Sequence, residues 1–148
     1  MMPDHRVIGL LACALAHEFS AVQLYLGQSK LTALWNLDEA SVRFRADMSA
    51  ELGHAEQLMD RLLRLGASPP AATLSAARMG RDLAEMLLID RAFEVEAVRL
   101  YREAVHYCER RRDEPHRALF ARILEDEIEH IRELDAWLAA LPKEAHRA

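Results

Sequence analysis

Residues 50–63 read AELGHAEQLMDRLL, and residues 124–138 read LEDEIEHIRELDAWL. Each stretch holds a glutamate followed three positions later by a histidine, among apolar side chains at helical spacing. The two pairs are Glu51 with His54 and Glu127 with His130. Residues three apart lie on one face of an α-helix, so the pattern places acidic groups on a face that is otherwise buried. An unpaired buried carboxylate costs several kcal/mol, so these groups need cations or protons beside them.

Two more glutamates occupy apolar helical stripes further upstream. Glu18 and Glu94 each precede the glutamate of one pair by 33 residues (51 − 18 = 33 and 127 − 94 = 33). Adding 76 to positions 18, 51 and 54 gives 94, 127 and 130, so the same three residues occur twice, as a pseudo-two-fold would relate them. One Glu-x-x-His often lies on a solvated helix face, whereas two copies with matching partners favour a metal centre. Four carboxylates and two imidazoles suit a pair of cations such as iron or manganese.

The composition favours helices. The chain has 148 residues, of which 51% are hydrophobic and 29% charged, with only 5 glycines and no alternating run of β-branched residues. The net charge is 19 − 24 = −5 with no basic stripe, so nucleic acid is not an expected partner. Cys13 and Cys108 are too few for a disulfide framework or a zinc ribbon, and we expect both to be small buried residues.

Four helices are expected in a single domain spanning 1–148, at approximately 5–34, 38–65, 82–112 and 114–141. Asp4 and Asp113 are the expected N-caps, and Gly66 suits the position after the second helix. The first and third links are short, which makes the helices that they join antiparallel. The middle link, 67–80, is long, and we expect it to let the third helix begin at the same end as the first. The fold class predicted is all-α, an antiparallel four-helix bundle with one long crossover, which resembles the ferritin-like topology.

The apolar run 7–16 near the N-terminus could be mistaken for a signal peptide. The residues before it include Asp4 and only Arg6 as a fixed positive charge, and the run is too short to span a membrane. Apolar residues continue at helical spacing beyond the run. We therefore expect the buried face of a longer helix and a cytoplasmic protein without membrane contact.

The segments HEFSAVQLY (17–25), AELGHAEQLMDRLL (50–63), FEVEAVRLYREA (93–104) and LEDEIEHIRELDAWL (124–138) resemble the four helices of bacterioferritin. The resemblance implies a ferroxidase that oxidises Fe(II) to Fe(III) with O₂ or H₂O₂ at an intrasubunit di-iron site, for iron storage and detoxification. It implies that Glu18 and Glu94 are terminal ligands and that Glu51 and Glu127 bridge the two irons. It also implies that His54 and His130 each bind one iron through the imidazole. Tyr25 matches a tyrosine near the family's site and is a candidate one-electron donor.

This sequence departs from the family pattern in two places. The family's haem is held by a methionine directly after the first bridging glutamate, where this chain has Leu52, so we do not expect haem. Met48 lies one turn away, but methionine at helical spacing is usually core packing. The chain also ends six residues beyond Pro142, too few for the short fifth helix of members that form 24-subunit shells. Ala46 and Ala50 replace inner-surface iron ligands of some members.

The assembly remains open between two forms. Apolar residues of the first two helices are expected to form the surface of a two-fold dimer: Leu24, Leu31, Phe44, Met48 and Leu52. We expect this dimer, with a slight preference for the complete shell. The alternative is a dimeric di-iron or iron–manganese protein that reduces oxygen or peroxide without storing mineral. A weaker alternative is a purely structural bundle whose acids are protonated or solvated.

The remaining polar residues have simpler interpretations. Asp90 lies one turn before Glu94 and is either a residue that orients a ligating imidazole or a surface charge. His17 is expected to be packed or solvated, because it points away from Glu18 on the helix. The histidines expected at the surface are His5, His106, His116 and His146.

Overall fold

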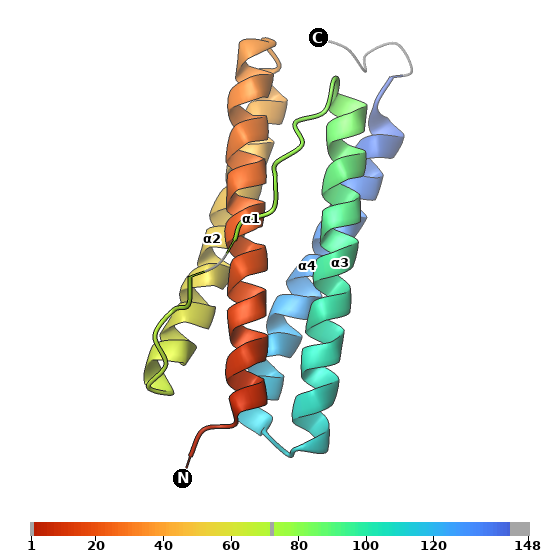
Figure 1. Ribbon diagram of the computed structural model, residues 1–148. Coiled ribbons are helices and arrows are strands. Elements are labelled where there is room, and N and C mark those ends of the chain that lie inside the picture. The colour runs from red at the N-terminus through yellow and green to blue at the C-terminus, as the bar shows by residue number, and fades with distance from the viewer. Residues whose placement is uncertain (1, 72, 143–148) are drawn as a thin grey trace.

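The computed structural model describes residues 2–71 and 73–142, which form four helices (Figure 1). The helices are α1 (His5–Leu34), α2 (Asp38–Arg64), α3 (Leu83–Arg110) and α4 (Glu114–Ala140). Their ends differ from the expected ranges by at most two residues, and the described residues contain no strand. The predicted four-helix bundle is confirmed. The expectation about a fifth helix, and that about His146, fall on residues outside the described part of the chain.

Local signals set the helix ends. Asp4, Asp82 and Asp113 each accept a backbone N–H from the first turn of the helix that follows, which satisfies donors that have no partner within the helix. Gly66, just beyond α2, has a φ of 77°, a left-handed conformation that glycine adopts without steric cost. Both N-caps expected from the sequence, Asp4 and Asp113, are therefore confirmed.

The direction of α3 differs from the expectation. Tyr101 of α3 contacts Glu18 of α1, and Glu94 of α3 contacts Tyr25 of α1, so residue numbers rise along α1 as they fall along α3. The two helices are antiparallel, and α3 begins beside the end of α1 (Figure 1). The prediction that it begins at the same end as the first helix is wrong. A short link would have produced that arrangement, whereas the long crossover carries the chain back along the bundle and makes α2 and α3 parallel.

The crossover lies against α1. The Ser75 N–H donates to Oγ of Ser20 at 3.0 Å, and the side chain of Met79 covers Gly27. A Cβ atom at Gly27 would lie 2.9 Å from the Met79 side chain, so glycine makes room for the crossover there. This close approach accounts for a glycine within a helix, where it costs about 1 kcal/mol relative to alanine.

Two apolar clusters fill the bundle, one toward each end. The first includes Leu11, Leu58 and Phe120, and the second includes Phe44 and Leu87. Along every helix, the acidic residues singled out in the sequence lie between the segments that contribute to these two clusters. The polar centre is therefore enclosed by hydrophobic packing on both sides.

Several burial expectations are wrong. Leu24 and Phe44 are buried in the core of the protomer, so they offer no surface to a dimer, while Leu52 is 39% exposed. Cys13 is exposed and only Cys108 is buried. His116 is buried, and its ring Nδ1 lies 2.8 Å from the Asp113 carboxylate. Helical position alone did not reveal which flank of each apolar stripe meets a neighbouring helix.

Helix α1 is long and apolar enough to cross a membrane if only length and composition are considered. Half of its most apolar window is buried inside the bundle, and the helix carries Glu18 into the polar centre. A core helix of a bundle passes the same test, and the packing of α1 accounts for its hydropathy.

Candidate metal centre

Four carboxylates and two imidazoles meet between the helices, and all six side chains are buried. Their ligand atoms form two groups, and within each group the atoms lie within 4.8 Å of one another. The first group is Glu18, Glu51, His54 and Glu127, and the second is Glu51, Glu94, Glu127 and His130. Glu51 and Glu127 belong to both groups, so the two subsites overlap. The structure thus brings together all six residues that the sequence singled out as metal ligands.

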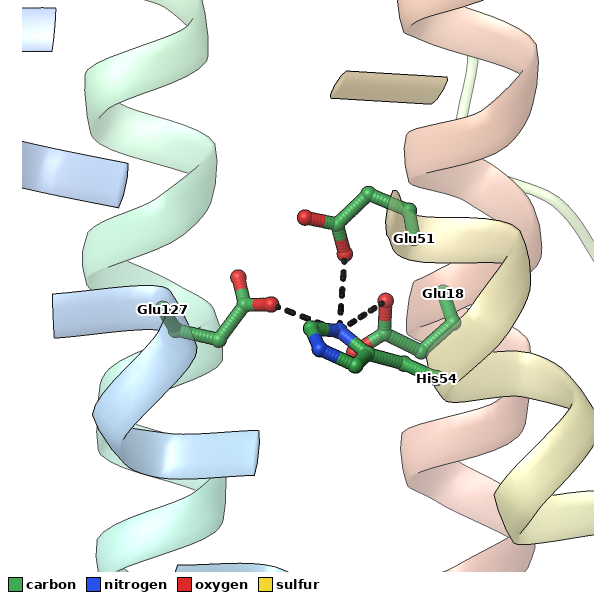
Figure 2. Close-up of side chains that lie close together, drawn as sticks. All are labelled: Glu18, Glu51, His54 and Glu127. Atoms are coloured by element: carbon green, nitrogen blue, oxygen red, sulfur yellow. Dashed lines mark ion pairs between the residues drawn. The ribbon is translucent and has the colours of Figure 1, made fainter. Parts of the chain in front are cut away.

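His54 faces three carboxylates in the first subsite (Figure 2). Its Nδ1 atom lies 3.0 Å from Oε1 of Glu127. The same nitrogen lies 3.5 Å from Oε2 of Glu51 and 3.6 Å from Oε2 of Glu18. Helices α1, α2 and α4 therefore all contribute to this subsite.

The second subsite repeats the arrangement around His130. Its Nδ1 atom lies 3.2 Å from Oε1 of Glu94 and 3.7 Å from Oε1 of Glu51. Replacing each residue of the first subsite by the one 76 positions away reproduces these partners. The sequence repeat is therefore a spatial pseudo-two-fold at the centre, as expected for an antiparallel pairing of α1 with α3.

The outward nitrogen of each imidazole faces an aspartate that the sequence interpretation did not assign to it. Nε2 of His54 lies 2.9 Å from Asp126, whereas Nε2 of His130 lies 3.4 Å from Asp47. Such contacts orient an imidazole and select the nitrogen that is free for a metal. The two halves differ here, because the position equivalent to Asp126 (126 − 76 = 50) is Ala50.

Asp90 is fully buried and accepts a hydrogen bond from Nε2 of Gln28 at 2.6 Å. The surface-charge interpretation of Asp90 is therefore wrong. His17 stacks on Phe93 with ring centroids 4.2 Å apart, so it is packed between α1 and α3 and does not face the centre. Neither residue belongs to the two ligand groups.

Two buried phenols contact the outer carboxylates. The Tyr25 hydroxyl donates to Oε1 of Glu94 at 2.5 Å, and the Tyr101 hydroxyl donates to Oε1 of Glu18 at 2.6 Å. The sequence interpretation selected Tyr25 and did not single out Tyr101. The repeat contained the missing signal, because 25 + 76 = 101.

Protons balance the carboxylates when metal is absent. Burial alone would lower the pKa of His54, but its contacts with Glu18 and Glu51 outweigh burial and raise that pKa to about 11. Burial opposes the charged form of His130 as well, yet contacts with the carboxylates of Asp47, Glu51 and Glu94 outweigh burial and raise its pKa to about 12. Both imidazoles are therefore positively charged in the metal-free protein, and a metal ion must displace their protons.

Burial also raises the pKa values of acidic groups at the centre. Burial, followed by the charge of Glu94, raises the pKa of Glu51 to about 8. Burial raises the pKa of both phenols well above the ordinary value, with Glu94 next in importance for Tyr25 and Glu18 for Tyr101. The centre therefore holds protons where metal ions would otherwise supply positive charge.

The donor atoms fit a pair of metal ions. Ten buried side-chain atoms find no hydrogen-bond partner in the part of the chain that the structure describes, and five of them belong to the carboxylates and the imidazole of the subsites: Glu18 Oε2, His54 Nδ1, Glu94 Oε2, and both carboxylate oxygens of Glu127. Buried polar atoms without partners are costly, and these five converge on the two subsites. Carboxylate oxygens and imidazole nitrogens are ligands suited to iron or manganese.

Comparison with known proteins places the chain in a family. A model of the ferritin-like domain matches residues 8–143. The chain is 32% identical over 143 residues to the bacterioferritin of Mycolicibacterium paratuberculosis, covering 97% of this chain and 90% of that protein. The chain belongs to the bacterioferritin family. Another family member, the bacterioferritin of Rhodobacter capsulatus, is 33% identical over 131 residues, covering 88% of this chain and 81% of that protein.

A solved bacterioferritin has the same fold. The structure of the Rhodobacter capsulatus bacterioferritin matches with a TM-score of 0.90 and 32% identity, covering 94% of this chain and 87% of that one. That protein was solved with a metal-free dinuclear site and a haem iron. The resemblance stated from the sequence and the ferritin-like fold are thereby confirmed.

The candidate haem position of this bacterioferritin-family chain lies on α2. Leu52 follows Glu51 and is 39% exposed, and its side chain has no atom that can ligate iron. Met48 is partly buried and packs against the cluster that contains Phe44, in agreement with its interpretation as core packing. That this chain does not bind haem stays a prediction.

Proposed function

We propose that this chain is a bacterioferritin-type ferroxidase, which binds two Fe(II) ions as substrate and oxidises them to Fe(III) with O₂ or H₂O₂ for iron storage and detoxification. The observation that carries the proposal is the overlap of two buried ligand groups through Glu51 and Glu127. Shared carboxylates hold two ions close enough to be oxidised together. Manganese is compatible with the same donor set at one position.

Each ligand has a distinct role in this proposal. Glu51 and Glu127 bridge the two ions because both belong to both groups. Glu18 and Glu94 each bind one ion as terminal ligands. His54 and His130 each supply one Nδ1 atom, after releasing a proton. Four ionised carboxylates balance the four positive charges of two Fe(II) ions, which limits the cost of burying them.

The ferroxidase is proposed to act in the cytoplasm as a homo-oligomer. The two-fold dimer is its expected unit, with a slight preference for the complete shell, and Leu52 remains exposed and available for such a contact. Size-exclusion chromatography with light scattering distinguishes a shell from the non-storing dimer, because a shell elutes far earlier. Iron counted per chain in the same fractions shows whether mineral accumulates.

The test compares ligand variants with a matched surface variant. Glu127→Ala should abolish stable binding of the metal pair, because it removes a ligand from both subsites, while the helical fold persists without metal. Glu125→Ala, two positions earlier and exposed, should bind two irons per chain like the unchanged protein and oxidise them in air. Metal analysis and oxygen uptake are the measurements. A Glu127→Ala protein that still holds two irons per chain would refute the site.

A further inference from the structure

The pseudo-two-fold of the metal centre extends beyond the six ligands to the two phenols. Tyr25 and Tyr101 differ by 76 positions, the same offset that relates the ligands. Their hydrogen bonds cross between the halves, since Tyr25 donates to Glu94 and Tyr101 donates to Glu18. Each subsite therefore has its own phenol, which is hydrogen-bonded to the one glutamate that belongs to that subsite alone.

The two phenols are alike in their burial and in their hydrogen bonds, although the ring beside each one differs. Both side chains are fully buried, and their hydroxyls make hydrogen bonds of 2.5 and 2.6 Å. Tyr25 lies in one apolar cluster, with its ring 5.5 Å from that of His130. Tyr101 lies in the other cluster, with its ring 6.2 Å from that of Phe120. Water is excluded from both rings, which would protect an oxidised phenol from side reactions.

The hydrogen bonds leave the second oxygen of each outer carboxylate without a hydrogen-bond partner in the described chain. Oε1 of Glu18 accepts from Tyr101, while its Oε2 has no such partner and lies 3.6 Å from Nδ1 of His54. Glu94 likewise has its Oε1 bonded to Tyr25 and its Oε2 free of hydrogen bonds. Each phenol is thus connected to a metal subsite through one carboxylate, a short path for an electron and a proton.

We propose that Tyr101 is a second phenolic electron donor, equivalent to Tyr25, so that the centre can supply all four electrons needed to reduce one O₂ to water. This inference rests on the proposed ferroxidase function. Two electrons come from two Fe(II) ions and one from each phenol: O₂ + 2 Fe(II) + 2 TyrOH + 2 H⁺ gives 2 H₂O + 2 Fe(III) + 2 TyrO•. Each phenol breaks its O–H bond and passes the proton, through the carboxylate that accepts its hydrogen bond, to the oxygen that is being reduced. Two further Fe(II) ions and two protons restore the phenols.

A chain with only Tyr25 inside the centre would supply three electrons at once and leave a partly reduced oxygen species. The second phenol supplies the fourth electron, so that no partly reduced oxygen species is left. Tyr101 acts through Glu18, to which its hydroxyl donates a hydrogen bond, so its role differs from that of the ligands. The consequence to be measured is the yield of tyrosyl radical and of released peroxide.

The three tyrosines of the chain allow a direct test. In Tyr25→Phe/Tyr107→Phe, Tyr101 is the only tyrosine left, and in Tyr101→Phe/Tyr107→Phe only Tyr25 remains. Tyr107 is a suitable third position because it bonds Asp4 near the end of the bundle, away from the centre. Metal-free proteins are loaded with two Fe(II) per chain without oxygen, mixed with O₂, frozen at intervals and measured by electron paramagnetic resonance. Ring-deuterated tyrosine narrows a tyrosyl signal and separates it from a tryptophan radical.

We expect each double variant to give a tyrosyl signal of about half the yield of Tyr107→Phe, because the two donors are equivalent. Released peroxide should rise in both, and the triple variant should give no tyrosyl signal. Absence of a tyrosyl signal when Tyr101 is the only tyrosine, with a full signal from Tyr25, would overturn the inference and leave Tyr101 as a residue that only positions Glu18. Anaerobic Co(II) titration separates this failure from that of the proposed function. An unchanged chain that does not bind two metal ions refutes the ferroxidase itself.

Discussion

The metal-free protein should lose stability as the pH rises above neutrality. His54 and His130 have pKa values of about 11 and about 12 in the folded protein without metal, against an ordinary value of 6.5. The folded state therefore holds two protons that the unfolded chain releases near neutrality. Their stabilising contribution is complete below about pH 6.5 and declines as the pH rises toward 11 or 12. Glu51 contributes with the same sign between its ordinary pKa of 4.5 and about 8.

The magnitude follows from proton linkage. Each proton bound by the folded state but not by the unfolded chain changes the unfolding free energy by about 1.4 kcal/mol per pH unit. Two imidazoles therefore remove at most about 2.7 kcal/mol per pH unit above about pH 7.5. A domain whose unfolding free energy is about 5–15 kcal/mol loses a large part of that free energy within two pH units at this rate.

Urea unfolding followed by circular dichroism, on chelator-treated protein at about pH 7, 8 and 9, measures the effect. His106→Gln is the matched control, because its imidazole is exposed, and its slope should equal that of the unchanged chain. Metal-loaded protein should behave in the opposite way, because metal binding requires the deprotonated imidazoles and strengthens as the pH rises. An unfolding free energy of the metal-free protein that stays constant or increases from pH 7 to 9 would refute this account of the charge balance.

Three further predictions concern α2, α4 and the protein surface. Asp126→Ala should weaken metal binding at the His54 subsite by about 10- to 100-fold in a Co(II) titration, and unchanged affinity would show that Asp126 does not orient the imidazole. Protein reconstituted with haem should show no bis-thioether spectrum, because Leu52 cannot ligate iron; a spectrum that disappears in Met48→Ala would place the ligand one turn away. Leu52→Lys should shift the oligomer toward smaller species in light scattering, because it introduces a charge into an apolar contact. A monomer at micromolar concentration in the unmutated protein would contradict the dimer.

The helix ends were predictable because their causes are local. Asp4 and Asp113 cap the turns that follow them, and Gly66 relieves the strain of a left-handed conformation at its own position. These effects depend on residues within one helical turn, which the sequence shows directly.

Burial and helix direction depended on packing. Phe44 and Cys13 both occupy apolar stripes, but Phe44 meets other helices in the core whereas Cys13 remains exposed. A stripe predicts that a helix has a buried face but not how far its partner extends across that face. The prediction of the direction of α3 was wrong for a related reason. The length of a loop does not determine which end of the bundle the loop reaches.

The sequence by itself determined the fold class and the candidate ligand set. The three-residue spacing of Glu51 and His54, repeated 76 positions later, requires both to share a helical face, and burial of such a face requires compensating positive charge. Only the tertiary structure decided which groups touch. The contacts of Tyr101 with Glu18, and of Asp126 with His54, join residues 83 and 72 positions apart. Such contacts depend on how the helices are packed side by side, and helical periodicity describes each helix only within itself.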